Sequence, residues 1–339
     1  MFDNYARESY WRFRVPQRLP KDHRYGTATE PGKFTDGTRV CPQPPSSKRP
    51  DPSVIDEDCL QLNIWLPVGP APKDGWPAQL VWIPRKQGIS RRSELQSRSY
   101  QKLRTMGSEI GVGLDSREKS FFGSDLGNIT VAGYSAGAYS SFQKLAHELF
   151  RVPEEKGIII RVAMFSNSTD VTPKSLQDQQ LQCDKLLTRL GINLALSDED
   201  KLTSLRAVPH HKLVQVQNGI RIPELRVWAD DTFYTADLMC KINNGEFAKR
   251  MKYRGIRLIN GHCDSEHIMY RRWRTPQESY SAVYQRLLAD SSPEATQKIM
   301  NHYCGSSKIL PVGYSNWEDL FGRIYANIQV HHLQRGFHN

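Results

Sequence analysis

Hydrophobic and polar residues are distributed along the chain in a pattern that predicts strands separated by helices. Continuous apolar runs bounded by turn residues are typical of buried parallel strands. Runs of this kind are QLVWI at 79–83 and ITVAG at 129–133. GIIIRVAMFSNS at 157–168 is also strand-like, and GIRLING at 255–261 reads as a strand that ends in glycine. The stretch 60–67, LQLNIWLP, alternates apolar and polar residues, which also indicates a strand.

Helical spacing of apolar residues follows these runs. From Ala138 to Leu149, apolar side chains recur every three or four residues, which predicts one helix with a single apolar stripe. Further helices are expected over four stretches, 175–191, 278–290, 293–303 and 317–337. Strands that alternate with helices indicate an α/β fold with a mostly parallel central sheet flanked by helices.

Two stretches interrupt this pattern. Residues 15–55 are rich in Pro, Gly, Lys and Asp and are expected to be mostly irregular. The stretch 85–120 is polar, and within it 110–114 is the one candidate strand. Its first part, 85–104, carries seven Lys and Arg residues against a single Glu, as a solvated loop does. We therefore expect an irregular basic segment over 85–120.

Composition narrows the class of protein further. The chain has 339 residues, of which 38% are apolar, which suffices for one large core, and its formal net charge is +10. No zinc-finger or aromatic-basic pattern accompanies that charge, so no nucleic-acid partner is expected. No run approaches the roughly 18 apolar residues of a membrane span. The first 17 residues lack the apolar segment of a secretory signal, which favours a cytoplasmic over a secreted location.

Candidate chemistry centres on Gly133-Tyr134-Ser135-Ala136-Gly137, which joins a predicted strand to a predicted helix. A serine at such a sharp turn stands clear of the backbone, and glycines two positions away on either side remove side chains that would clash. The N–H of Ala136 would then serve as an oxyanion donor, helped by the positive end of the helix. The pattern predicts Ser135 as a nucleophile rather than as a small residue in a turn.

Three stretches resemble the type-B carboxylesterase family, and its fungal branch in particular. Glu57–Ile64, read as E-D-C-L-Q-L-N-I, is similar to a signature of that family. Gly133–Gly137 resembles its nucleophile elbow, and Gly261–Glu266 resembles the loop that bears its acidic residue. Weaker similarity extends from about Arg12 to Phe337.

The resemblance implies one α/β-hydrolase domain over 1–339 that hydrolyses small-molecule carboxylic esters through a serine acyl-enzyme. Ser135 would attack the carbonyl carbon, and Glu266 would orient a histidine base, with Asp264 as the competing acid. Cys41 and Cys59 match a disulfide of the family. None of the six cysteines forms a C-x-x-C pair, and no metal or organic cofactor is expected.

The chain also departs from the family pattern in two places. Pro84–Gly88 stands where the family has a His-Gly-Gly-Gly loop that completes the oxyanion pocket, and a strand and helix before the elbow lack counterparts. A sheet without that strand is expected to leave unpaired edges. The family's histidine lies beyond the segment 317–337, so a missing C-terminal part is expected. The histidines after Glu266 are each expected to be structural or exposed: His267, His302, His331, His332 and His338.

These departures leave three hypotheses from different classes. The first is an active serine ester hydrolase. The second is a catalytically inactive protein of the same fold that acts by binding a partner. The third, ranked last, is a basic binder of anionic surfaces through 85–104, whose affinity would fall steeply with salt.

Overall fold

The chain divides into two compact units, one formed by Met1–Gln61, Gln87–Gln96 and Cys183–Gly219 and the other by Leu62–Lys86, Ser97–Gln182 and Ile220–Asn339. The computed structural model describes most of the chain from residue 127 onward and short pieces before it. The described residues are 12–13, 29, 41–42, 52–57, 63–64, 79–83, 105–107, 127–169, 175–220, 229, 231, 233–272 and 274–338.

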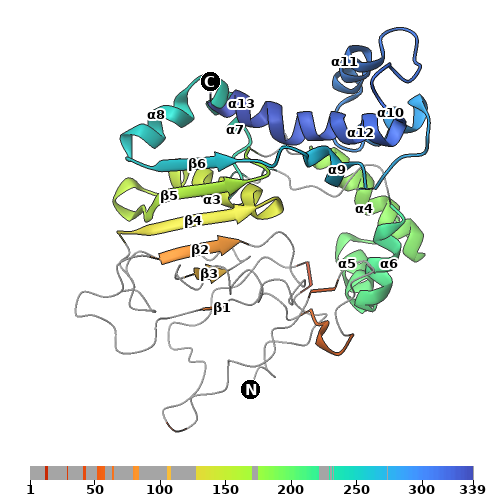
Figure 1. Cartoon of the computed structure of the whole chain (residues 1–339). Helices are drawn as coiled ribbons and strands as arrows, with labels where there is room; N and C mark the ends of the chain where they lie inside the picture. Colours follow the sequence, from red (N-terminus) through yellow and green to blue (C-terminus); the bar gives the residue numbers. More distant parts are fainter. Residues whose placement is uncertain are drawn as a thin grey trace. The chain divides into compact units, whose positions relative to one another are not determined.

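The second unit is built on a six-stranded sheet with the order β1-β3-β2-β4-β5-β6 (Figure 1). Its strands are β1 (Asn63–Ile64), β2 (Gln79–Ile83), β3 (Thr105–Gly107), β4 (Ile129–Tyr134), β5 (Ile159–Phe165) and β6 (Arg257–Gly261). β1 runs antiparallel to β3, and all other neighbours are parallel. The mostly parallel sheet expected from the apolar runs is confirmed.

The short strand β3 corrects one expectation. Val81 of β2 lies opposite Met106 of β3 on one side and opposite Val131 of β4 on the other. β2 is therefore paired along both edges, and the expectation that a missing strand would leave this part of the sheet unpaired is wrong. The segment Thr105–Gly107 carries no apolar pattern, so its pairing with β2, rather than its own sequence, makes it a strand. The candidate strand 110–114 lies outside the described residues.

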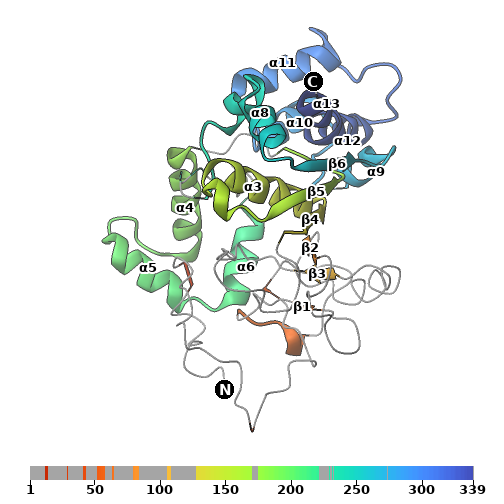
Figure 2. The same ribbon diagram turned by 90° about the vertical axis from the view of Figure 1, so that its left-hand side faces the viewer.

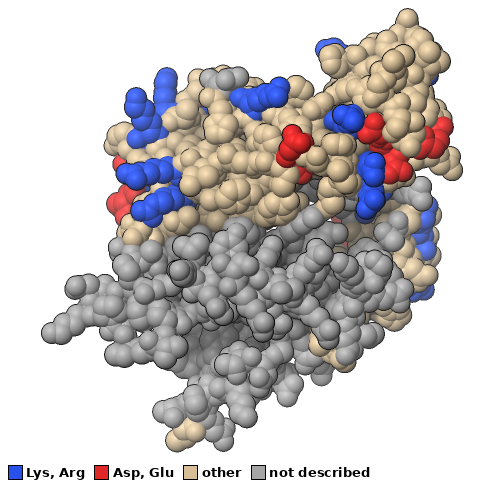
Figure 3. Space-filling view, viewed as in Figure 1, with Lys and Arg blue, Asp and Glu red and all other residues tan. Residues whose placement is uncertain are grey.

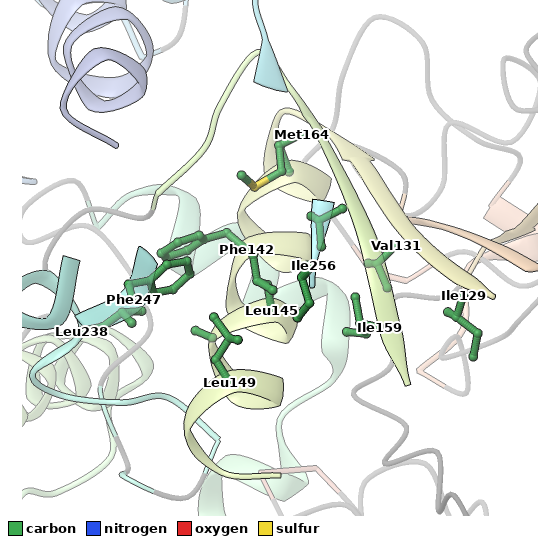
Figure 4. Packing of buried hydrophobic residues seen from close by; sticks show 13 residues of the cluster. Ile129, Val131, Phe142, Leu145, Leu149, Ile159, Met164, Leu238, Phe247 and Ile256 are labelled. Carbon is green, nitrogen blue, oxygen red and sulfur yellow. The ribbon is translucent and has the colours of Figure 1, made fainter. Parts of the chain in front are cut away.

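Helix α3 (Ala136–Phe150) covers one face of the sheet at β4 and β5, as the view along the strands in Figure 2 shows. Its buried residues recur at the helical spacing that the sequence predicts, and Phe142 and Leu145 are fully buried. They pack against strand residues and against Phe247 to form the first hydrophobic cluster, shown in Figure 4. Phe142 and Phe247 stack with their ring centroids 5.6 Å apart. This cluster fixes α3, and with it the turn that precedes the helix.

Apart from η2, which precedes β5, the remaining helices of the second unit described next come after β5 in the chain. They are α7 (Leu238–Asn243), α8 (Glu246–Tyr253), α9 (Glu266–Tyr270), α10 (Tyr280–Leu287), α11 (Pro293–Cys304), α12 (Trp317–Ala326) and α13 (His332–His338), with short turns η2 (Glu154–Lys156) and η3 (Asn327–His331). The turn η3 is π-helical and joins α12 to α13 without a break. Residues of α10, α11 and α12 form a second hydrophobic cluster in which Phe321 and Tyr325 are fully buried.

The first unit contains η1 (Pro52–Val54), most of α4 (Leu176–Leu190), α5 (Asp198–Ala207) and α6 (His210–Asn218). Arg12 is 8% exposed and donates two hydrogen bonds to the carboxylate of Glu57, at 2.7 and 2.5 Å. Its Nη1 also donates to the carbonyl of Leu205, at 3.1 Å, near the end of α5. Glu57 opens the E-D-C-L stretch, so this residue of the sequence signature belongs to a buried ion pair that also satisfies a helix terminus.

Figure 3 shows several Lys and Arg side chains over the amino ends of β5 and β6, and others toward the opposite side of the same view, where Asp and Glu side chains also lie. The basic stretch 85–104 lies outside the described residues. Within the described part of the chain, every helix is too short or too polar to traverse a lipid bilayer.

Candidate active site

Ser135 occupies the one-residue turn between β4 and α3. Its φ of 57° and ψ of −118° place a residue with a Cβ in a region that such residues rarely adopt. The turn is held by its backbone, because the N–H of Ser135 donates to the carbonyl of Phe165 at 2.8 Å and its carbonyl accepts from Ala138 at 2.9 Å. The side chain is half-buried and makes no capping hydrogen bond to α3. This is the geometry of a nucleophile elbow.

Gly133 is the residue that allows this turn. A Cβ atom at this position would lie 2.1 Å from the carbonyl oxygen of Gly137 and 2.8 Å from the nitrogen of Ala138. Both contacts are far shorter than van der Waals separation, so the start of α3 approaches β4 closely only because residue 133 lacks a side chain. This close approach supports the sequence-based explanation of the glycine, and its part in a catalytic turn stays a prediction.

Ala136 begins α3 directly after Ser135 and is exposed. The N–H groups of the first helical turn have no acceptor within the helix, and the helix dipole adds partial positive charge there. An N–H at this place can stabilise an oxyanion that develops at a carbonyl attacked by Ser135. The oxyanion role of Ala136 stays a prediction that this position supports. The segment Pro84–Gly88, which stands where the family has its His-Gly-Gly-Gly loop, lies outside the described residues.

Glu266 lies beyond the carboxyl end of β6, at the first position of α9. β4, β5 and β6 are parallel, so the residues after their ends share the edge of the sheet where Figure 1 places the start of α9. Glu266 is 5% exposed, and its Oε1 accepts a hydrogen bond from the N–H of Cys263 at 3.0 Å. Asp264, the competing acid, is exposed and contacts the hydroxyl of Ser265 at 3.5 Å. The geometry favours Glu266 over Asp264.

Three further side chains lie near the two candidate catalytic residues, Ser135 and Glu266. The hydroxyl of Tyr134 and the sulfur of Cys263 are 3.8 Å apart, and the hydroxyl of Ser166 is 3.8 Å from the same sulfur. A hydrogen bond from Ser166 acts to lower the pKa of Tyr134, but burial, the thiol of Cys263 and the charge of Glu266 outweigh it, so this pKa is raised. The carboxylate is thus close enough to act on the residue next to Ser135. Sequence reasoning missed Ser166 and Cys263, because a serine or cysteine after a strand carries no signal by itself.

His331 is one of the late histidines for which a structural or exposed position is expected. It lies in η3, half-buried, with its ring centroid 4.6 Å from that of His262. Burial and the neighbouring imidazole of His262 lower the pKa of His331, whereas the charge of Glu266 acts in the opposite direction. Gln334 fixes the adjoining helix by donating to Asn260 at 2.8 Å and by contacting His262. His331 therefore shares the surroundings of Glu266.

The cysteines agree with the expected pattern as far as they are described. Cys41 is disulfide-bonded, and Cys59, its expected partner, lies outside the described residues. Four others are free thiols: Cys183, Cys240, Cys263 and Cys304. Among the described residues, no three His, Cys, Asp or Glu side chains are grouped as a metal ion would require.

A mostly parallel sheet, a serine at a strained strand-to-helix turn and a buried acid after another strand of the same sheet define an α/β-hydrolase. A crystal structure of juvenile hormone esterase from Manduca sexta, with OTFP covalently attached, shares this fold with a TM-score of 0.58. That structure is 18% identical in sequence, and the similarity covers 86% of this chain and 62% of the esterase. No family model matches the chain.

Two curated relatives show, by their sequence identity, the family to which the chain belongs. A protein of Gibberella moniliformis named carboxylic ester hydrolase is 59% identical over 100% of this chain and 77% of its own length. An uncharacterized esterase/lipase of Schizosaccharomyces pombe is 30% identical over 78% of this chain and 56% of its own length. The chain belongs to the carboxylic ester hydrolases of the type-B carboxylesterase family.

The alignments also show how the chain differs from these relatives in length. The match to the Gibberella protein extends over 421 residues, 82 more than the 339 residues of this chain. That relative therefore carries internal stretches that have no counterpart here. The chain spans little more than half of the Schizosaccharomyces protein and less than two thirds of the juvenile hormone esterase.

Proposed function

We propose that this chain hydrolyses small-molecule carboxylic esters through an acyl-enzyme formed on Ser135. The hydroxyl oxygen of Ser135 attacks the ester carbonyl and gives its proton to a base. In this class of enzyme the base is a histidine that a carboxylate orients, and Glu266 takes the role of that carboxylate. The N–H of Ala136 stabilises the negative charge on the carbonyl oxygen. The alcohol then leaves with the proton, and water releases the acid by the same steps in reverse.

The observation that carries this proposal is the backbone conformation of Ser135. Three other serines in the chain begin helices as ordinary N-caps, with negative φ and a hydroxyl that accepts from a backbone N–H of the first turn: Ser197, Ser279 and Ser292. Ser135 differs on both counts. A left-handed residue with a Cβ costs about 1–3 kcal/mol and is concentrated at functional sites, so a serine that accepts this cost without capping its helix supports a catalytic role.

Labelling with a fluorophosphonate probe tests the proposal. We expect intact-mass analysis to show one adduct per folded chain, at Ser135, and Ser135→Ala to abolish it. Ser140→Ala is the matched control, because Ser140 is an exposed serine of the adjoining helix α3. Its hydroxyl donates to the carbonyl of Ala136, one helical turn earlier, at 3.2 Å. Folded wild-type protein that does not label would overturn the acyl-enzyme and favour an inactive protein of this fold that acts by binding.

A further inference from the structure

A cavity of about 410 Å³ lies at the end of α3 that is farther from Ser135, between the last turn of α3, the loop before α7, and the helices α7 and α8. α3 begins at the carboxyl end of β4, and its 15 residues span about 22 Å, so its last turn lies near the amino ends of the parallel strands. Figure 1 places α8 toward the amino ends of the strands and α9 beyond their carboxyl ends. The cavity has the volume of a small-molecule site and is separate from the candidate active site.

Charged side chains of both signs surround this cavity and neutralise one another. Two of the cations, Lys241 and Arg250, share the carboxylate of Glu246 at 3.4 and 3.1 Å. Lys241 also contacts the carboxylate of Asp237, at 2.8 Å. A further pair of one cation and one carboxylate completes the group, which thus holds three charges of each sign. A ligand with a net charge would disturb this balance, so a neutral ligand that carries both signs fits the cavity best.

The further pair, Arg151 and Asp231, leaves hydrogen-bonding capacity of both kinds unused. Nη2 of Arg151 donates to Oδ1 of Asp231 at 2.8 Å, and no other partner of this guanidinium lies among the described residues. Oδ1 of Asp231 also accepts from the N–H of Ala236 at 3.0 Å, whereas its Oδ2 has no partner in the described part of the chain. A guanidinium has five N–H donors and a carboxylate about four acceptor positions. Donors and acceptors for a ligand therefore lie side by side at this cavity.

Two features of the same loop are typical of a binding site. Asp231 has a φ of 55°, a conformation that is costly for a residue with a Cβ and is concentrated at functional sites. Thr235 lines the cavity and is 4% exposed, and its buried hydroxyl has no hydrogen-bond partner among the residues that the structure describes. A buried polar group without a partner is costly. A ligand oxygen that accepts a hydrogen bond from Thr235 would remove this cost.

We propose that this cavity binds an α-amino acid with an apolar side chain. The carboxylate of the ligand takes the unused N–H groups of Arg151 and the hydroxyl of Thr235, and its ammonium group donates to the unused oxygen of Asp231. A single carbon separates the two charged groups of an amino acid, which matches a guanidinium and a carboxylate in direct contact with each other. The side chain of the ligand packs against Phe150, which lines the same cavity. The inference is independent of the proposed function, because the cavity lies away from Ser135.

Isothermal titration calorimetry with three matched ligands tests the class of ligand. We expect L-phenylalanine to bind the folded chain with a Kd of about 1 mM or tighter. Phenylpropionate lacks the ammonium group and phenethylamine lacks the carboxylate, so each should bind about tenfold more weakly, having lost charged hydrogen bonds. Equal affinity for either analogue, or no binding of L-phenylalanine at about ten times that concentration, would overturn the proposal. Ser135→Ala should bind L-phenylalanine as the wild-type chain does, and loss of binding in this variant would overturn the placement of the ligand in this cavity.

Substitutions at the cavity locate the ligand. Arg151→Gln and Asp231→Asn each remove one charge, and we expect each to weaken the binding of L-phenylalanine about tenfold. Thr235→Val keeps the shape of the side chain and removes the unpartnered hydroxyl, so binding should weaken while the thermal midpoint stays the same or rises. Lys298→Gln, which breaks an exposed pair with Glu294 on α11, is the control and should bind as the wild-type chain does. Wild-type affinity in Arg151→Gln or in Asp231→Asn would overturn the site.

Discussion

The end of β4 and the start of α3 are in direct contact at Gly133 and Gly137, where a Cβ on the first would lie 2.1 Å from the carbonyl oxygen of the second. Gly133→Ala must therefore displace either the strand or the helix. We expect a loss of about 3 kcal/mol in the free energy of unfolding, the upper range for an overpacked core, and loss of probe labelling at Ser135. Urea denaturation and intact-mass labelling measure the two effects.

Gly336→Ala is the matched control for this substitution. Gly336 lies in α13 with no atom within 4 Å of an added Cβ. Alanine is the better helix former, so we expect stability to rise by up to about 1 kcal/mol and labelling to stay unchanged. If Gly133→Ala were as well tolerated as this control, the close contact at the turn would be refuted.

The choice of acid can be tested by paired amide substitutions. Glu266→Gln keeps the shape of a buried side chain but removes its charge, and we expect the rate of ester hydrolysis to fall on the order of 10⁴-fold, as when the orienting carboxylate of a serine hydrolase is replaced by an amide. Asp264→Asn should change the rate by less than about twofold, because this carboxylate is exposed. The reverse ranking in steady-state assays would assign the acid to Asp264.

The ion pair between Arg12 and Glu57 should matter for stability far more than a surface pair. Their side chains are 8% and 18% exposed, and removal of one partner leaves the other charge buried. We expect Arg12→Ala to cost about 3–5 kcal/mol in urea denaturation. Lys298→Ala, which breaks an exposed pair with Glu294, should cost less than about 0.5 kcal/mol. Equal costs for the two variants would contradict a buried role for Arg12.

Burial lowers the pKa of His331 in the folded chain, with His262 acting in the same direction and Glu266 against it. As pH falls below about 6.5, the unfolded state gains a proton at this residue before the folded state does. The free energy of unfolding therefore decreases as the solution becomes more acidic. We expect His331→Asn to weaken this fall between pH 7 and 5. His332→Asn, at the exposed neighbouring histidine, should leave the wild-type slope intact. Parallel slopes for wild type and His331→Asn in denaturation at several pH values would contradict a lowered pKa of His331 in the folded chain.

Sequence reasoning succeeded where one local signal determines the structure. The apolar runs at 79–83 and 129–133 became β2 and β4, and the stripe from Ala138 to Leu149 became the buried face of α3. The reason proposed for the glycine at 133 is local as well, because an added Cβ would meet atoms only four and five positions further along the chain. These features lie within a few residues of each other, so the sequence pattern alone contains them.

It failed where a residue obtains its role from a distant partner. β3 is a strand because β2 pairs with it, and its residues Thr105–Gly107 show no strand pattern. The helices α5 and α6 were not expected, because their polar sequences lack an apolar stripe. Ser166 was passed over for the same reason, since Tyr134 and Cys263 lie about 30 and 100 residues away along the chain.

The π-helical turn Asn327–His331 places one more residue in a turn than an α-helix would. Before it, Tyr325 is fully buried in the second hydrophobic cluster, and after it, Phe337 packs edge-on against Phe142 of the first, with ring centroids 5.8 Å apart. Deleting one residue here would twist α13 by about 100° about its axis. The two hydrophobic clusters are therefore coupled through the length of this turn. A change in its length would move either Tyr325 out of the second cluster or Phe337 away from the first.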